Sequence, residues 1–189
     1  MQRIQLNGYN VLSFIKNYFK PAQDIFTWKY IDVDNDLVEE IRDIYLKNLK
    51  ENLSQYNFFQ VLPICIPNVM GQEVIGAGLV YSSGNHKSSY AHKDPIVKDL
   101  STFALNIPLV NCQDSLTTLY KSRKAPMYNF NSYGITEIAK LSNCDAVTSY
   151  TLDKPILFNT QVLHAVDNLS PTPRLAISLR FTSNPVEWL

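Results

Sequence analysis

Apolar residues recur every three or four positions in the N-terminal quarter of the chain and alternate with polar residues afterwards. Between residues 32 and 55, one helical face carries Leu37, Ile41, Ile44 or Tyr45, Leu49 and Leu53. Asp36 followed by Glu39 matches a capping box, so we predict that this helix begins near Asp36. A second helix is expected from Tyr9 to Phe19, because Pro21 would end it.

From about Tyr56 the hydrophobic period shortens to two. The β-rich runs are residues 57–66, 73–82, 101–110, 115–120, 146–152, 155–159, 162–166 and 174–182. Residues 136–141 (TEIAKL) are expected to form one or two helical turns between them. Many short strands without long helices between them predict a sandwich or a barrel.

The chain has 189 residues, a length typical of one domain. No linker rich in Pro, Gly or Ser marks a boundary. We therefore predict a single domain, 1–189, in which a helical buttress (1–55) precedes a β core (56–189).

The composition narrows the classes of partner. Hydrophobic residues make up 46% of the chain and charged residues 18%, which is typical of a globular protein. Seventeen basic and seventeen acidic residues balance, and only Lys121 to Lys124 form a short basic run. Binding to nucleic acid or to a membrane surface is therefore not expected.

Neither a signal peptide nor a long apolar segment is visible, so a cytoplasmic location is expected. The three cysteines, Cys65, Cys112 and Cys144, lie far apart and are expected to be reduced.

Candidate metal ligands come from a His-x-Asp triplet. In an extended segment the side chains of His92 and Asp94 point to the same side, as two ligands of one metal require. His164 lies within an apolar strand pattern and could supply a second imidazole. Two histidines and one carboxylate form the facial triad of non-haem Fe(II) sites. An ordinary surface turn at His92 and a satisfied core histidine at His164 are the alternative readings.

A candidate anion site follows ten residues after His164. Arg174, Ser178 and Arg180 share one face of the run 174–181. A buried guanidinium requires an anionic partner, and a dicarboxylate would suit its fork with help from the Ser178 hydroxyl. Arg180 could take the role of Arg174, or these residues could face water at a sheet edge.

The order of His92, Asp94, His164, Arg174 and a following serine resembles the motif set of the Fe(II)- and 2-oxoglutarate-dependent dioxygenases. The strand blocks FALNIPLVNC and LTTLY are similar to segments of small microbial and phage members of that family. The resemblance extends roughly from Tyr81 to Phe181. It implies a double-stranded β-helix, a cupin-like jelly-roll barrel with its metal at the open mouth.

The resemblance also implies roles for individual residues. His92, Asp94 and His164 would bind Fe(II), and Arg174 would bind the distal carboxylate of 2-oxoglutarate. Residues on the polar faces of two further strands could also reach the cosubstrate, although ordinary packing is an equal alternative; these residues are Asn106, Thr118 and Tyr120. Residues 82–91 are expected to form a mobile lid, with His86 available to the substrate.

The activity implied is an O2-dependent hydroxylation of a small-molecule or peptidyl substrate, with release of succinate and CO2. The alternatives are a jelly-roll binding protein without catalysis and a cupin-type metalloprotein without 2-oxoacid chemistry.

Overall fold

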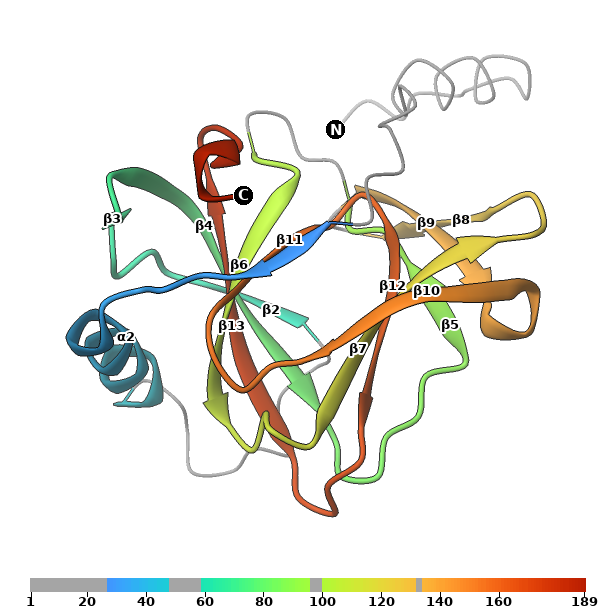
Figure 1. Ribbon diagram of the computed structural model, residues 1–189, viewed down its shortest axis with the longest axis horizontal. Helices are drawn as coiled ribbons and strands as arrows, with labels where there is room; N and C mark the ends of the chain where they lie inside the picture. Colours follow the sequence, from blue (N-terminus) through green and yellow to red (C-terminus); the bar gives the residue numbers. More distant parts are fainter. Residues whose placement is uncertain (1–26, 48–58, 96–99, 132–133) are drawn as a thin grey trace, which may run out of the picture.

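The computed structural model describes residues 27–47, 59–95, 100–131 and 134–189, which fold into two antiparallel sheets and one α-helix (Figure 1). The seven-stranded sheet contains, in spatial order, β1 (Trp28–Tyr30), β11 (Ile156–Asn159), β6 (Phe103–Val110), β13 (Arg174–Phe181), β4 (Gln72–Ser82) and β2 (Phe59–Leu62), with β3 (Asn68–Val69) paired to β4. The six-stranded sheet contains β10 (Cys144–Thr151), β7 (Ser115–Ser122), β12 (Leu163–Asn168), β5 (Tyr90–His92), β9 (Gly134–Lys140) and β8 (Met127–Asn131). The prediction of a mainly β chain is confirmed.

From β4 onward the chain passes repeatedly between the two sheets. Strands β4, β6, β11 and β13 are neighbours in the seven-stranded sheet, and β5, β7, β10 and β12 are neighbours in the six-stranded sheet. The pair β8 and β9 extends the second sheet beyond β5. This winding makes neighbours of strands that are far apart in sequence, such as β5 and β12.

The alternation in β13 gives the seven-stranded sheet an apolar outer face. Leu175, Ile177, Leu179 and Phe181 are buried in one cluster with Ile41 and Tyr45 of α2 (Asn35–Lys47), which covers this face (Figure 1). Burying each such side chain stabilises the fold by about 1.5–3 kcal/mol. The alternate positions of β13 therefore face the other sheet.

The facing sides of the two sheets share a second apolar cluster. It includes Ala104, Phe158 and Ala176 from the seven-stranded sheet and Leu119 and Tyr150 from the six-stranded sheet. At the β1–β10 side, the indole of Trp28 packs on Tyr150 with ring centroids 5.1 Å apart and donates to Thr148 Oγ1 at 3.2 Å. These contacts close that side of the space between the sheets.

Helix α2 begins at Asn35, one residue before the start predicted near Asp36, and its N-cap differs from the predicted one. Asp34 Oδ1 accepts the backbone N–H groups of Asp36 and Leu37 at 2.9 and 3.2 Å, so Asp34 is the N-cap. Asp36 lies in the first turn, where its charge favours the helix N-terminus. Leu49, Leu53 and the helix expected from Tyr9 to Phe19 lie outside the described residues.

Each of the eight predicted β runs contains a strand, but the expected helical turns at 136–141 are wrong. Most of this segment belongs to β9, which pairs with β5 on one side and β8 on the other. The ladder hydrogen bonds on both sides outweigh a local helix preference too short to be stable alone. Only Leu141–Asn143 form a short 3-10 turn.

Among the described residues, no helix is both long and apolar enough to cross a lipid bilayer.

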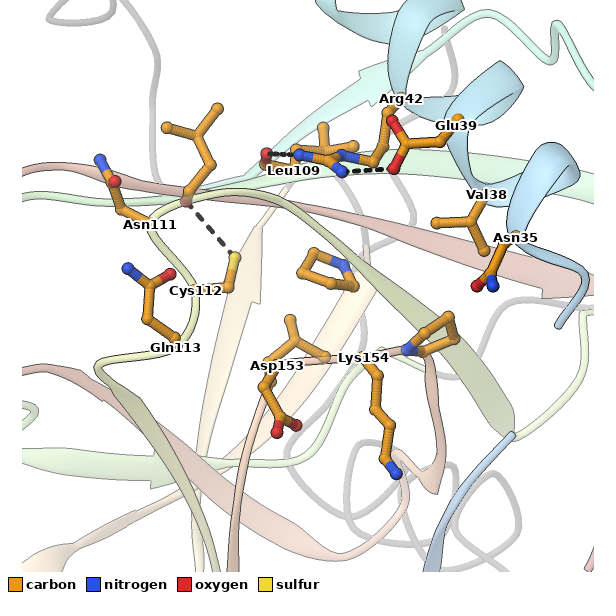
Figure 2. Close-up of a pocket in the computed structure, with 14 residues that line it drawn as sticks. Asn35, Val38, Glu39, Arg42, Leu109, Asn111, Cys112, Gln113, Asp153 and Lys154 are labelled. Carbon is orange, nitrogen blue, oxygen red and sulfur yellow. Dashed lines mark hydrogen bonds and ion pairs between the residues drawn. The ribbon is translucent and has the colours of Figure 1, made fainter. Parts of the chain in front are cut away.

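A surface pocket of about 300 Å³ lies between α2, the end of β6 and the connection from β10 to β11 (Figure 2). Arg42 of α2 forms part of its wall and is held by Glu39 at 2.7 Å and by the Leu109 carbonyl at 3.3 Å. None of the residues predicted for the metal and cosubstrate sites lines this pocket.

The assignment of the helix cap gives a test of local stability. Asp34→Ala should lower the free energy of unfolding by about 1 kcal/mol, because two backbone donors lose their acceptor. Asp36→Ala is the matched control and should cost less, since it removes only a charge near the helix dipole. Urea unfolding of both variants measures the difference, and a larger loss for Asp36→Ala would show that Asp34 is not the cap.

Candidate metal centre

Two of the candidate ligands are cross-strand neighbours. His92 ends β5 and is paired in register with His164 of β12, so both side chains project from the same face of the six-stranded sheet. Their ring centroids are 4.4 Å apart. The antiparallel pairing of β5 with β12 thus brings together histidines that are distant in sequence.

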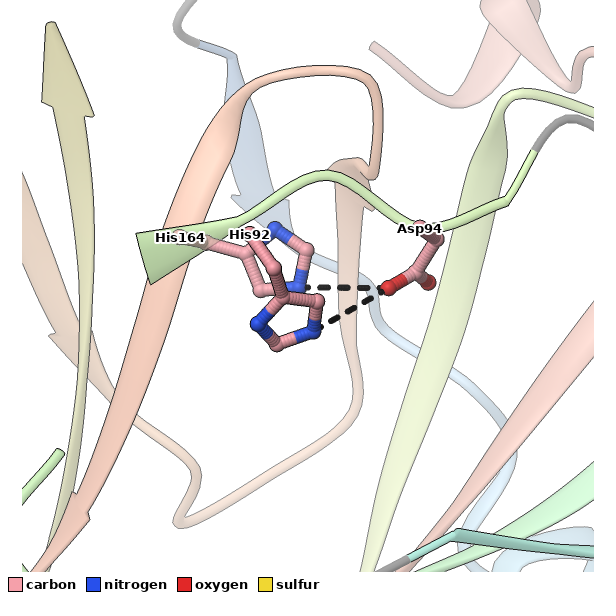
Figure 3. A group of neighbouring side chains, drawn as sticks. All are labelled: His92, Asp94 and His164. Carbon is pink, nitrogen blue, oxygen red and sulfur yellow. Dashed lines mark ion pairs between the residues drawn. The ribbon is translucent and has the colours of Figure 1, made fainter. Parts of the chain in front are cut away.

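Asp94 completes the cluster from the segment that follows β5. Its Oδ1 lies 3.5 Å from His92 Nε2 and 3.5 Å from His164 Nε2 (Figure 3). One ligand atom from each of the three residues lies within 4.8 Å of the other two, so the group could hold a metal ion. Two imidazoles and one carboxylate form the donor set that suits Fe(II) while leaving coordination positions free.

The orientation of His164 is fixed by its own strand. Its Nδ1 lies 2.9 Å from the Val162 carbonyl, a contact that requires a proton on Nδ1. Nε2, which is directed at Asp94, is then the nitrogen that can bind a metal ion, and a metal would displace any proton that Nε2 donates to Asp94. Phe158 packs edge-on against the ring at 5.1 Å and limits its rotation.

The protonation states of the cluster also suit a metal. Burial acts to raise the pKa of Asp94, but hydrogen bonds from His164 and His92 and the charge of Arg180 hold it well below its usual range. Burial and the nearby His164 lower the pKa of His92, with partial opposition from Asp94. A carboxylate and a neutral imidazole are therefore present at neutral pH, as metal binding requires.

The turn between β11 and β12 supports both Asp94 and His164. The Thr160 carbonyl accepts the Asp94 N–H at 3.0 Å, and Gln161 Nε2 donates to the Asp94 carbonyl at 3.1 Å. The next residue, Val162, supplies the carbonyl that orients His164. Thr160, Gln161 and Val162 are all buried, so this turn is part of the core.

Arg174 is fully buried on the inner face of β13, and its charge has no anionic partner among the described residues. Nε donates to Ser115 Oγ at 3.0 Å, whereas Nη1 has no hydrogen-bond partner there. Burial raises the pKa of both neighbouring acids, the Cys112 thiol and the Tyr150 phenol, so neither is an anion at neutral pH. Burial also lowers the pKa of Arg174, which reflects the cost of an uncompensated buried charge.

Other buried polar groups on the inner faces of the two sheets also lack partners. Of the five buried side-chain atoms without a hydrogen bond in the described part of the chain, four face the space between the sheets: Ser82 Oγ, Asn106 Oδ1, Tyr150 Oη and Arg174 Nη1. Ser82 pairs directly with Arg174 across β4 and β13. The pKa of Tyr150 responds to both Arg174 and Asp94, so its phenol lies within electrostatic range of both. Unsatisfied buried groups that face one space between two sheets are consistent with a site for a polar ligand.

The other residues predicted for the cosubstrate site lie on different faces of the two sheets. Asn106 and Ser178 are opposite each other on the inner face of the seven-stranded sheet, but no contact joins Ser178 to Arg174, four residues away on the same strand. Thr118 and Tyr120 pair with Ala165 and Leu163, whose side chains point away from the face that carries His164.

The structure therefore does not bring Thr118 and Tyr120 to His92, Asp94 and His164. The inward positions of β7 are odd-numbered, because Leu119 is the residue that pairs with His164. Thr118 instead bonds the Ser149 hydroxyl at 2.9 Å, and Tyr120 packs on a small outer cluster. Ordinary cross-strand hydrogen bonding and packing, the alternative stated for these residues from the sequence, therefore describes both Thr118 and Tyr120.

The segment 82–91 is held along β12, in contrast to the mobile lid expected for it. Asn168 Nδ2 donates to the Ser83 carbonyl at 2.9 Å, and Asp167 Oδ1 accepts the Ser88 N–H at 2.8 Å. Ser88 Oγ donates to the Val166 carbonyl at 2.9 Å. His86 forms a β-bridge with Asn168, four residues from His164, so it does not join the candidate ligands His92, Asp94 and His164.

Arg180 is engaged differently from Arg174. Its guanidinium contacts the Asp94 carboxylate, the Ser101 carbonyl and the Thr160 hydroxyl. Arg180 therefore contacts one of the candidate metal ligands, whereas Nη1 of Arg174 has no hydrogen-bond partner among the described residues.

Sequence reasoning did not identify Tyr150, Thr160 or Gln161. The position of Tyr150 on an inner face depends on a register shift in β10 between Ala146 and Thr148, which the sequence pattern does not reveal. Thr160 and Gln161 make contacts to Asp94 that involve its backbone groups, and the only local signal was a polar pair between two buried strands.

Comparison of the sequence with models of protein families and with curated proteins found no match.

If His92, Asp94 and His164 hold a metal ion, the affinity for that ion should depend on each of these side chains. His164→Ala should weaken Co(II) binding by more than the roughly 10- to 100-fold typical of groups that only support a ligand. His86→Ala is the matched control and should bind Co(II) as the wild type does, because His86 lies outside the cluster. Isothermal titration calorimetry measures both affinities. Equal losses in the two variants would argue against a site at His92, Asp94 and His164.

Proposed function

We propose that this protein is a non-haem Fe(II)- and 2-oxoglutarate-dependent oxygenase that hydroxylates a small-molecule or peptidyl substrate. The observation that carries the proposal is the pairing of a His-Asp-His cluster with a buried arginine that has no anionic partner among the described residues. The first group matches the requirements of Fe(II), and the second those of a carboxylate. Both face the space between the two sheets.

The strand order supports a double-stranded β-helix as the finer description of the fold. Eight strands from β4 to β13, with β8 and β9 set aside, form two four-stranded sets in the order β11-β6-β13-β4 and β10-β7-β12-β5, and the chain changes sheet at every step except from β7 to β10. A jelly roll winds eight strands in two sheets in this manner. In this description β8 and β9 are an insertion, and β1, β2 and β3 extend the other sheet.

The polar groups near Arg174 would bind 2-oxoglutarate. The free Nη1 of Arg174 and the neutral Tyr150 hydroxyl can both donate to its distal carboxylate, and the Ser82 hydroxyl is a third donor on the same inner face. Hydrogen bonds to a charged acceptor contribute about 1.5–3 kcal/mol each. The ligand would also supply the negative charge that Arg174 lacks.

His92, Asp94 and His164 would hold the metal. Bound Fe(II) would supply the redox chemistry that couples oxidative decarboxylation of 2-oxoglutarate to oxidation of a C–H bond. The overall reaction consumes 2-oxoglutarate, O2 and substrate, and yields succinate, CO2 and the hydroxylated product. One oxygen atom enters succinate and the other enters the product.

The aromatic side chains at the β1–β10 side would keep water away from this chemistry. Trp28 covers Tyr150, and Tyr30 bonds the Thr151 carbonyl at 3.1 Å. Phe158 lies between this wall and His164, with ring centroids 6.2 Å from Tyr150 and 5.1 Å from His164. Exclusion of water strengthens the electrostatic contacts to the cosubstrate and limits side reactions.

The direct test is an anaerobic titration of the Fe(II)-loaded protein with 2-oxoglutarate. We expect the weak visible charge-transfer band of a chelated 2-oxoacid in the wild type and its loss in His164→Ala. In air, the same protein should release succinate from 2-oxoglutarate when its substrate is present. Iron binding without the band would contradict 2-oxoglutarate chemistry and leave only a metal-binding protein.

The role of Arg174 can be tested separately. Arg174→Gln should weaken 2-oxoglutarate binding to the metal-loaded protein at least about tenfold, because it removes a charged donor. Arg123→Gln is the matched control, since Arg123 is exposed and contacts exposed Asp145 at 3.5 Å and the Ser142 carbonyl at 2.9 Å. Isothermal titration calorimetry compares both variants with the wild type. Unchanged affinity in Arg174→Gln would refute its assignment as the carboxylate partner.

Removing the Tyr150 hydroxyl gives a finer test of the same site. Tyr150→Phe keeps the ring that packs on Trp28 and Phe158 but removes the unpartnered donor. We expect 2-oxoglutarate affinity to fall about tenfold while thermal stability stays equal or rises, because an unsatisfied buried group disappears. Unaltered affinity would exclude the phenol from the cosubstrate site.

A further inference from the structure

Arg180 reaches the Asp94 carboxylate from the opposite sheet. Its side chain is 14% exposed, and its Nη2 donates to Asp94 Oδ2. The other terminal nitrogen, Nη1, donates to the Ser101 carbonyl at 2.9 Å and to Thr160 Oγ1 at 3.0 Å. One planar guanidinium thus joins the carboxylate to two fixed points of the seven-stranded sheet and its β11–β12 turn.

The acceptors of Arg180 are themselves fixed. Thr160 donates twice to the Thr102 carbonyl, from N at 2.9 Å and from Oγ1 at 2.8 Å. Ser101 is tied to β13, because its N–H donates to the Phe181 carbonyl at 2.8 Å. With both acceptors held in place, the rigid fork of Arg180 has one orientation that satisfies all three contacts.

The two oxygens of Asp94 consequently have different surroundings. Oδ2 is taken by Arg180, whereas Oδ1 lies 3.5 Å from Nε2 of both histidines. The terminal torsion of an aspartate is broad and roughly two-fold, so an unrestrained carboxylate could present either oxygen or both. The contacts around Asp94 remove that freedom.

We propose that Arg180 is a positioning residue that restricts Asp94 to a single ligand oxygen and so keeps a coordination position free for the cosubstrate. The inference rests on the metal centre proposed above and concerns how its ligands are presented. A carboxylate that offered both oxygens would occupy one more position on the metal. Lysine would not replace Arg180, because an ammonium lacks the planar fork that meets three acceptors at once.

The experiment compares the visible absorption spectrum of the Co(II)-loaded protein, which reports the coordination number, before and after 2-oxoglutarate is added. Arg180→Gln should change the spectrum before any cosubstrate is present, and should weaken 2-oxoglutarate binding about 10- to 100-fold. Arg174→Gln should weaken 2-oxoglutarate binding but leave the initial Co(II) spectrum unchanged. Arg123→Gln should match the wild type in both respects, because its partner Asp145 is far outside the cluster.

Thr160→Val provides a milder variant if Arg180→Gln does not fold. It removes one acceptor of Arg180 and keeps a side chain of similar shape, so we expect a smaller spectral change in the same direction. Arg180→Lys should resemble Arg180→Gln in its spectrum.

The outcomes separate this inference from the proposed function. A wild type that does not bind Co(II) would overturn the metal centre itself. Co(II) binding with identical initial spectra in the wild type, Arg180→Gln and Thr160→Val would overturn the positioning role and leave the metal centre intact.

Discussion

The ionised carboxylate of Asp94 is the point at which the two sheets are joined electrostatically. It contacts His92 and His164 of the six-stranded sheet and Arg180 of the seven-stranded sheet. A carboxylate between two sheets is costly to desolvate, and only several charged or hydrogen-bonding partners in good geometry can offset that cost. The position of β5 against β12, the β11–β12 turn and the inner face of β13 all contribute to meeting this requirement.

The inner faces of the sheets differ in polarity from one part to another. Near β1 and β10 they are aromatic and aliphatic, and they form an ordinary core. Around Arg174 they hold a buried charge and several polar atoms without partners among the described residues, which lowers stability in the absence of a ligand. The apolar outer face under α2 supplies stabilisation that such a site requires. Local sacrifice of stability at a functional site is a common feature of enzymes.

The sequence predicted the strands because apolar residues alternate along them, and the apolar positions of β13 and β6 are buried in the cluster that includes α2. It also predicted that His92 and Asp94 would point the same way, since that depends only on local extension. Segment 136–141 was mispredicted because its pairing with β5 is non-local. The faces of Thr118 and Tyr120 were misjudged because a shift of one residue inverts every side chain of a strand.

The supporting residues of the site were not predictable for a different reason. Thr160 and Gln161 hold Asp94 through a turn whose backbone direction no side-chain pattern encodes. The different surroundings of the two arginines depend on the three-dimensional fold, in which Arg180 reaches the Asp94 carboxylate and Arg174 reaches the Ser115 hydroxyl. Both arginines lie on the same face of one strand, so sequence alone left their roles interchangeable.

The measurement that tests the central claim most directly is a crystal structure of the protein with Mn(II) and 2-oxoglutarate, with the metal located by anomalous diffraction. The account predicts one Mn(II) bound by His92 Nε2, His164 Nε2 and Asp94 Oδ1, with the distal carboxylate of 2-oxoglutarate on Arg174 and Tyr150. Metal bound elsewhere, or a cosubstrate carboxylate that displaces Asp94 from Arg180, would contradict it.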